Sequence, residues 1–284
     1  MQRPADPCTV PRMGRQRTRS HFRGDYKRML KTNRVLGGAL FAFALIASQA
    51  VAYADDEKAV SLIVQPKVGR VTHSTGIVKT SVMGMDMVIN GHEKETVKEV
   101  KENGDVVTET IDEGSTVKVG GKESDQTPSP PRIKIHDKFG KLKDYKSQDN
   151  SQFTTPEIDA LLESLVTLIL TDKPVKTNDT WQTELENPAV KEKKIMVKGT
   201  YLGLDKIDGK DYWKIKQTAE AAADAHGATI VYDFTQWIDP ATGETFKSEG
   251  TVKGVPTMVG PLTFEVTTKA VKAGDKDKPL PIRL

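Results

Sequence analysis

The sequence predicts a mainly β (α+β) protein, built as a strongly curved antiparallel sheet with one prominent helix packed on its concave face. Most of the chain after residue 70 alternates apolar and polar residues between Gly-containing turns, which is typical of antiparallel hairpins. One segment, residues 154–174, instead repeats apolar residues at helical spacing. Strand-rich segments of similar design precede and follow it, and its apolar stripe needs a sheet face for burial.

The first 54 residues have the pattern of a leader. The stretch "MLKTNRVLGGALFAFALIASQAVAYA" has a basic flank, a short apolar run and a small-x-small signature, so we expect a signal peptide cleaved after Ala54. The alternative is an uncleaved membrane anchor, which needs about 20 apolar residues, and this run is shorter. The arginine-rich residues 1–28 are either a nucleic-acid-binding arm or sequence upstream of a true start at Met29, and we favour the second.

Charge and cysteine content narrow the class of protein. Residues 1–54 contain ten Lys or Arg and two Asp, so the rest of the chain carries a net charge of −5, whereas the whole chain carries +3. Such an acidic chain is not expected to bind nucleic acid. The single cysteine, Cys8, lies in the leader, so the mature chain has no disulfide, no cysteine nucleophile and no lipid-attachment cysteine.

We therefore expect a periplasmic or secreted protein with no stable membrane span after the leader is removed. Residues 55–272 are long enough to form a single β-rich domain, and residues 273–284 are predicted to be a flexible tail.

Turn signals divide the chain after the leader into its expected elements. Asn103-Gly104 closes a first hairpin, residues 120–132 have the composition of a linker, and residues 133–145 return as strand. The helix is expected to begin at a capping box of Thr154 and Glu157, and to end at Pro174. Strands then resume. Residues 218–226 are alanine-rich, which favours helix, but their position between two strands favours a long hairpin.

Three methionines, Met83, Met85 and Met87, occupy alternate positions that would share one face of a strand. Thioethers suit Cu(I), so a copper site is one interpretation. The other is an apolar wall of a ligand cavity, because methionine adapts to irregular surfaces. We favour the second, and expect neither a metal nor a cofactor. The predicted ligand-binding residues are Met83, Met85, Met87, Ile158, Leu161 and Leu165.

No catalytic constellation is present in the sequence. The motif "STVK" at residues 115–118 matches the first element of serine penicillin-interacting enzymes, but the Ser-Asp-Asn and Lys-Thr-Gly partners are missing. No G-x-S-x-G, P-loop or H-E-x-x-H motif occurs, and the histidines after the leader are scattered singly. The sequence therefore predicts a protein that is not an enzyme.

Three stretches carry a family resemblance: "MGMDMVINGHEKETVKEVKENGD", "LTDKPVKTNDTW" and "WIDPATGETFKSEG". Across roughly Val71 to Lys272 the chain resembles uncharacterised secreted bacterial proteins related to the lipoprotein-localisation-factor type of half-barrel. The resemblance implies an incomplete antiparallel barrel, helices plugging its concave side and a cavity for acyl chains. The chain departs from that pattern in having one strong helix and no lipid-attachment cysteine.

The leading hypothesis is an exported, non-enzymatic carrier or sensor of a lipid or other hydrophobic ligand. The alternative is a structural or protein-interaction module of the cell envelope, with a filled core and an envelope protein as its partner. Methionine-based copper binding is the third hypothesis.

Overall fold

The computed structural model describes residues 58–63, 66–147 and 154–272. All described residues belong to one compact unit. The predicted leader, its cleavage site at Ala54 and the predicted tail lie outside the described residues.

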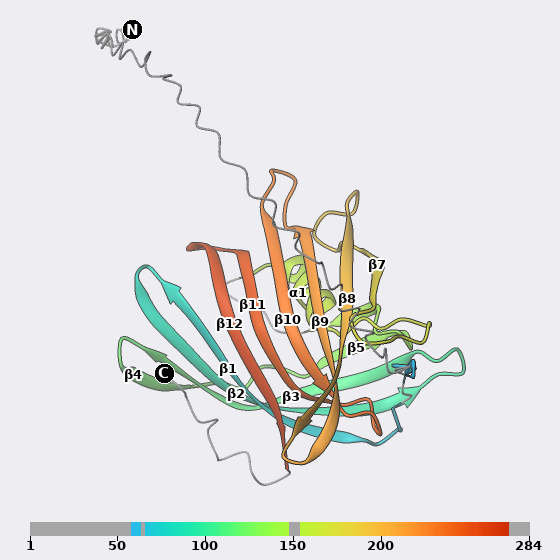
Figure 1. The fold of residues 1–284 in the computed structure, drawn as a ribbon. Coiled ribbons are helices and arrows are strands. Elements are labelled where there is room, and N and C mark those ends of the chain that lie inside the picture. Colours follow the sequence, from blue (N-terminus) through green and yellow to red (C-terminus); the bar gives the residue numbers. More distant parts are fainter. Residues whose placement is uncertain (1–57, 64–65, 148–153, 273–284) are drawn as a thin grey trace, which may run out of the picture. The chain divides into compact units, whose positions relative to one another are not determined.

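The described part of the chain consists of one antiparallel sheet and one helix, α1 (Pro156–Val166) (Figure 1). The strands are β1 (Val71–Val82), β2 (Met85–Val100), β3 (Val106–Val119), β4 (Lys122–Gln126), β5 (Arg132–His136), β6 (Leu142–Lys146), β7 (Thr180–Glu186), β8 (Lys194–Ile207), β9 (Lys210–Ala222), β10 (Thr229–Ile238), β11 (Thr245–Thr257) and β12 (Gly260–Val271). The mainly β, antiparallel prediction is confirmed.

The path of the chain through the sheet explains where the helix lies. The strand order is β6-β5-β3-β2-β1-β12-β11-β10-β9-β8-β7, with β4 pairing the end of β3, so the order is linear among the described strands. The chain starts at β1 in the middle and runs outward to β6 at one edge. It then returns from the opposite edge, β7, to β12, which pairs with β1. The segment that joins the two edges must cross a face of the sheet, and α1 belongs to this segment.

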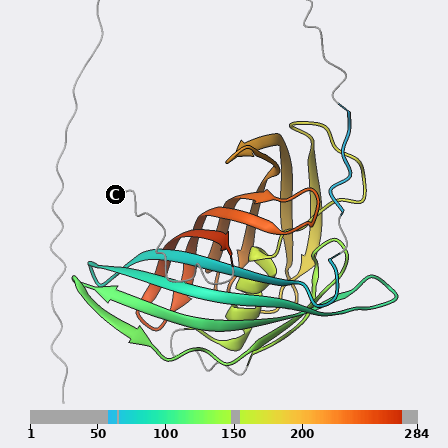
Figure 2. The ribbon, with the colours of Figure 1, turned by 90° about the horizontal axis from the view of Figure 1, so that it is seen from below.

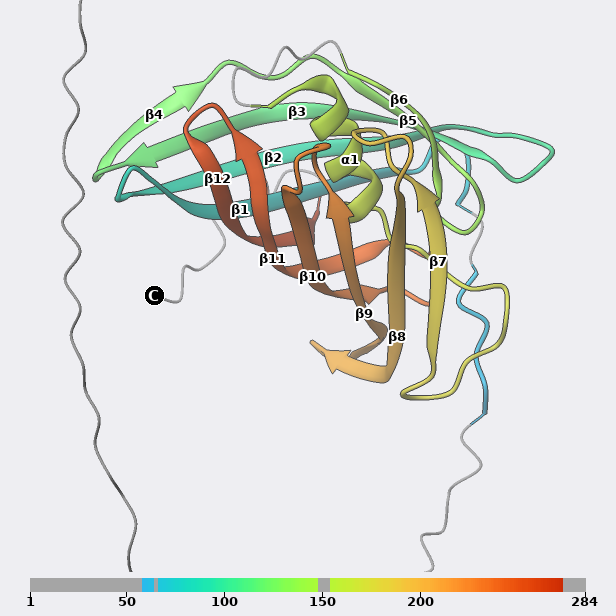
Figure 3. The same cartoon turned by 90° about the horizontal axis from the view of Figure 1, so that it is seen from above.

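The apolar stripe of α1 packs on the β7–β11 half of the sheet, where Figure 3 shows the helix. Ile158, Leu161 and Leu165 are buried there with side chains of the strands. Each large side chain buried in this way stabilises the fold by about 1.5–3 kcal/mol. The strand residues of this core cluster are Leu185, Ile195, Val197, Ala219, Ala221, Ile230, Tyr232, Phe234, Val252 and Val255.

The sheet is strongly bent (Figure 2), as expected for a curved half-barrel. Register shifts interrupt several ladders, among them β2–β3 at His92/Glu93, β8–β9 between Tyr201 and Leu204, and β11–β12 between Lys253 and Val255. Such bulges bend a strand and increase its twist.

The helix is shorter than the sequence predicts. Its N-cap is Thr155, whose Oγ1 accepts a hydrogen bond from the Ile158 amide at 3.4 Å, and not Thr154. Its last residue is Val166, so Leu168 and Ile169, which continue the apolar spacing, lie outside it. Helical periodicity therefore located the helix but misjudged its end.

The early end of α1 has an identifiable cause on β9. The Gln217 amide nitrogen donates to the carbonyls of Leu165 (2.9 Å) and Thr167 (3.1 Å), and its Oε1 accepts from the Ile169 amide (2.8 Å). These bonds satisfy carbonyls that the end of a helix leaves without partners. They hold the chain beyond Val166 against the sheet, in place of another helical turn.

Two other segments differ in how well the sequence predicted them. The alanine-rich residues 218–226 form the end of β9 and a turn, which confirms the hairpin. The segment predicted as a linker contains β4, which pairs with β3 from Ser115 to Val119, so the linker prediction is wrong for Lys122–Gln126. All five residues of β4 are exposed, and its pairing is therefore not visible as an apolar pattern.

Candidate ligand-binding site

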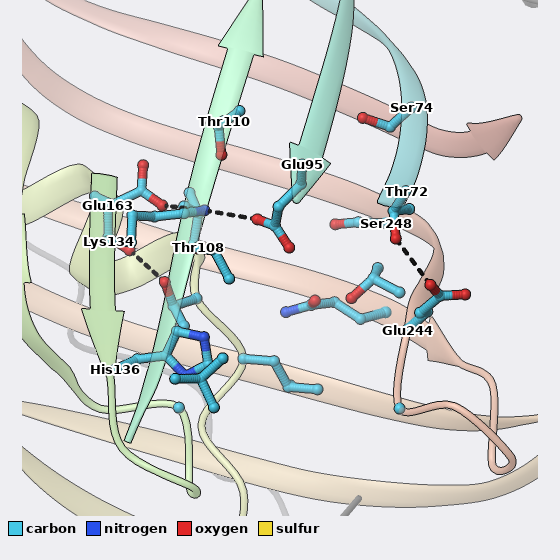
Figure 4. Close-up of a pocket in the computed structure, with 18 of the residues that line it drawn as sticks. Thr72, Ser74, Glu95, Thr108, Thr110, Lys134, His136, Glu163, Glu244 and Ser248 are labelled. Carbon is cyan, nitrogen blue, oxygen red and sulfur yellow. Dashed lines mark hydrogen bonds and ion pairs between the residues drawn. The ribbon is translucent and has the colours of Figure 1, made fainter. Parts of the chain in front are cut away.

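A cavity of about 480 Å³ opens on one face of the bent sheet. Its wall includes residues of β1, β2, β3, β5, β10, β11, β12 and α1, so strands from both halves of the sheet contribute to one space. Figure 4 shows the polar part of this wall.

Cross-strand register places a row of polar side chains on the wall. Thr72 of β1 pairs with Glu95 of β2, Glu95 with Thr110 of β3, and Thr110 with Arg132 of β5. Residues directly opposite each other on antiparallel strands share a face of the sheet. The four side chains therefore line the cavity together, although they lie up to 60 residues apart in sequence.

A lysine held between two carboxylates lies beside this row. Lys134 Nζ is 3.1 Å from Glu95 Oε2 and 3.0 Å from Glu163 Oε1 of α1 (Figure 4). Burial by itself would lower the pKa of Lys134, but the carboxylates of Glu163 and Glu95 outweigh it and raise that pKa above the ordinary value for lysine. The ammonium group in turn lowers the pKa of Glu95, against the opposing effect of burial.

Two other cations of the wall are also paired. Arg132 forms an ion pair with Glu93, and Arg70 Nε lies 3.1 Å from Glu244 Oε1, which also accepts a hydrogen bond from the Thr72 hydroxyl at 2.8 Å. The inner wall therefore carries three cations against four glutamates. Its cationic groups are already neutralised by the protein.

Two buried polar atoms on the wall have no hydrogen-bond partner among the described residues. They are Thr108 Oγ1 and Thr110 Oγ1, and the two residues are 2% and 5% exposed. Buried polar groups in proteins are nearly always paired, with protein or with a bound molecule. These atoms are available to a molecule inside the cavity.

The rest of the wall is apolar. Tyr232 and Phe234 of β10 stack with ring centroids 4.4 Å apart, and Val252, Val266 and Val106 continue this surface. The cavity thus has an apolar part and a polar part, as small-molecule sites commonly do.

Small side chains explain why the space is not filled. The strands in the middle of the sheet present Ser74, Ser248, Thr268 and Ala270 to the cavity. The neighbouring half of the sheet presents large residues that close against α1. The volume is therefore left where β1, β12 and β11 meet.

The predicted helix residues lie next to this cavity but do not form its wall. Ile158, Leu161 and Leu165 are 5%, 0% and 0% exposed and belong to the packed core, whereas α1 contributes Glu163 and Val166 to the wall. A role for the first three in ligand binding stays a prediction.

The predicted methionines lie at and beside the β1–β2 hairpin tip. Met83 occupies the turn with φ 52° and is 81% exposed, so it does not share a strand face with Met85 and Met87. Met85 is 50% exposed and pairs with Val82, and none of the three lines the cavity. Their roles in ligand or copper binding stay predictions.

A second cavity of about 760 Å³ is more open. It lies over the segment 170–183, with Phe139 and Lys141 at its side. In the ranges that the structure describes, no three His, Cys, Asp or Glu side chains gather as metal ligands. No helix among these residues is long and apolar enough to cross a membrane.

No protein-family model matches the sequence, and no curated protein is similar to it. Twelve solved chains are structurally similar. A lipovitellin structure concerned with lipid–protein interactions has 10% identity, covers 72% of this chain and 25% of its own, and has a TM-score of 0.41. The hypothetical lipoprotein YmcC from Escherichia coli (K12) has 14% identity, coverages of 73% and 89%, and a TM-score of 0.24.

A domain from Vibrio parahaemolyticus, named for outer membrane lipoprotein sorting, has 11% identity, coverages of 75% and 92%, and a TM-score of 0.22. These neighbours include proteins of the kind that the sequence resembles. At TM-scores below 0.5, none of them transfers a ligand or partner to this chain.

The polar residues of the wall were missed by reasoning from sequence. Thr108, Thr110 and Glu95 each have at least one polar neighbour in the sequence, and nothing in the local pattern distinguishes a side chain that faces a cavity from one that faces water. The available signal was the parity of β3, where Val106 and Thr108 share a face with Thr110 and all three are buried.

Proposed function

We propose that the protein is an exported, non-enzymatic binding protein, a carrier or sensor of a hydrophobic ligand that it holds in the cavity between α1 and the concave face of the sheet. The observation that carries the proposal is the cavity itself, with its aromatic and aliphatic part beside a polar part. Its volume of about 480 Å³ lies within the range of small-molecule sites. The leader pattern in the sequence supports export to the periplasm or the medium.

The test is binding of a fluorescent apolar probe, N-phenylnaphthylamine, to the exported protein. Ser248→Phe places a ring in the cavity from β11, and we expect it to weaken probe binding by about tenfold or more, which corresponds to about 1.4 kcal/mol. The control is Ser81→Phe, which changes an exposed serine of β1 outside the cavity. Equal affinity of wild type and Ser248→Phe, both folded, would contradict binding in this cavity.

Native mass spectrometry of the exported protein, purified without detergent and gently delipidated, adds a readout without a probe. A co-purified lipid mass that is lost in Ser248→Phe supports the carrier. A clean protein mass in both forms, together with no probe binding, counts against it.

One observation favours the alternative, an interaction module of the cell envelope. Met83 and Met258 are 81% and 79% exposed at the tips of the β1–β2 and β11–β12 hairpins, and β1 pairs with β12. If the protein is such a module, it should form a cross-linked adduct with an envelope protein in intact cells. The double variant Met83→Ser, Met258→Ser should abolish this adduct, and Ser248→Phe should not.

A further inference from the structure

The polar part of the cavity carries information about the ligand that goes beyond its being hydrophobic. This inference rests on the proposed function, because it concerns the occupant of the same cavity. Two features decide it: the wall cations Lys134, Arg132 and Arg70 are already paired, and neutral hydroxyl groups are left without partners.

The charge balance opposes an anionic headgroup. Lys134 contacts two carboxylates, and Arg132 and Arg70 contact one each. An anion approaching Lys134 would also approach Glu95 and Glu163, and like charges in a poorly solvated space repel strongly. Fatty-acid carboxylates and lipid phosphates therefore meet no uncompensated cation in the inner wall.

One more cation belongs to the wall. Lys138, in the turn between β5 and β6, has no carboxylate at ion-pair distance among the described residues, but its side chain is exposed, with Nζ 5.1 Å from the Phe139 ring centroid. Asp137 and His136 are beside it, and the His136 Nδ1 is 3.0 Å from the Asp137 carbonyl oxygen. A solvated cation next to a carboxylate attracts an anion weakly.

The unpartnered hydroxyl groups of Thr108 and Thr110 are neutral, and their residues lie opposite charged residues of the neighbouring strand. Thr108 pairs with Lys134 across β3 and β5, and Thr110 pairs with Arg132 on the same face. Figure 4 shows both threonine side chains beside Lys134 and Glu95. A hydroxyl group can both donate and accept, so two adjacent hydroxyls suit a ligand that carries hydroxyl or amide groups.

We infer that the cavity binds an amphiphile with an uncharged head bearing hydroxyl or amide groups, such as a monoacylglycerol, and discriminates against the fatty-acid anion of the same chain length. The head lies against Thr108 and Thr110. The acyl chain lies along Tyr232 and Phe234. A lone aliphatic chain leaves the buried hydroxyls unpaired, which makes the neutral polar head the preferred occupant.

The experiment is displacement of N-phenylnaphthylamine from the exported protein at neutral pH by monolauroylglycerol and by laurate, each below its micelle-forming concentration. We expect monolauroylglycerol to displace half of the probe at a concentration about tenfold or more below the concentration of laurate that does so. One or two hydrogen bonds to buried groups provide a difference in affinity of this size. The double variant Thr108→Val, Thr110→Val should lose this preference while it keeps its affinity for the probe. Thr263→Val, an exposed threonine of β12 outside the cavity, should behave as wild type.

The outcomes separate the two proposals. Absence of probe binding to the wild type removes the proposed function itself. Probe binding with laurate equal to or better than monolauroylglycerol overturns only the inference about the head. A valine double variant that keeps the wild-type preference also overturns the inference about the head, because the two hydroxyls would then not contact the ligand. Circular dichroism of each variant checks that it is folded.

Discussion

Gln217 provides the clearest test of how α1 is held on the sheet. Its side chain is completely buried and makes three hydrogen bonds to the chain that leaves the helix, to Leu165, Thr167 and Ile169. Replacing Gln217 with leucine keeps a similar side-chain volume and removes all three bonds. The perturbation is therefore a loss of hydrogen bonds with little change in packing.

The magnitude depends on the groups left behind. The Leu165 carbonyl and the Ile169 amide belong to fully buried residues, and the Thr167 carbonyl to a half-buried one. An unsatisfied buried backbone group costs about 1–3 kcal/mol, so we expect Gln217→Leu to lower the free energy of unfolding by about 3–5 kcal/mol. That is a large fraction of the about 5–15 kcal/mol typical of folded proteins.

The assay is urea unfolding of the protein followed by tryptophan fluorescence, with Gln182→Leu on the edge strand β7 as the control. Gln182 is exposed, so its replacement should change stability by no more than about 0.5 kcal/mol. Hydrogen exchange should also quicken selectively in α1 of Gln217→Leu. A loss below about 1 kcal/mol, or exchange that quickens equally in every strand, would refute the account of the helix end.

The ion pairs of the wall and the close strand contacts give three other predictions. Lys134 lowers the pKa of Glu95 below its ordinary value of 4.5, so the Glu95 carboxylate binds a proton more readily in the unfolded chain than in the folded one. Stability should therefore fall as the pH drops below about 4.5, and less steeply in Glu95→Gln, as thermal melts across that range would measure. Lys134→Met should cost about 3 kcal/mol in urea unfolding, because it leaves two carboxylates unpaired; a cost near zero would contradict the ion-pair role. Gly250→Ala should cost about 2–3 kcal/mol, since its Cβ would lie 2.1 Å from the Asp233 carbonyl oxygen, whereas Gly91→Ala, with its nearest atom 3.9 Å away, should be tolerated.

The parts of the fold that could be predicted are those specified locally. Alternation and Gly turns located the hairpins, and the apolar spacing from Ile158 to Leu165 located the helix, because both signals lie within a few residues of the structure that they determine. The end of α1 could not be predicted. It depends on Gln217, about 50 residues further along the chain, and on the pairing of β9 that brings its side chain under Leu165.

The candidate site was beyond prediction for the same reason. Apolar patterns in the sequence directed the predicted ligand site to methionines and helix residues. The wall instead contains Thr110, Glu95 and Lys134, which come together only when β2, β3 and β5 are in register. The pairing of β1 with β12 has no local signal either, since it joins strands almost 200 residues apart.

That pairing also determines where a ligand can be held. At the β1–β12 seam the ladders place Ser74 opposite Ala270, and Thr268 opposite Ser248 of β11, so small side chains gather on one face in the middle of the sheet. Away from the seam, larger residues close against α1. The helix therefore needs to fill only the β7–β11 half, and the unfilled seam lies between the stacked rings of β10 and the polar row of β2, β3 and β5. An amphiphile bound there would have its chain on the first surface and its head on the second, which is why exchanging polar atoms on β3 should change its head preference and leave the affinity for an apolar probe intact.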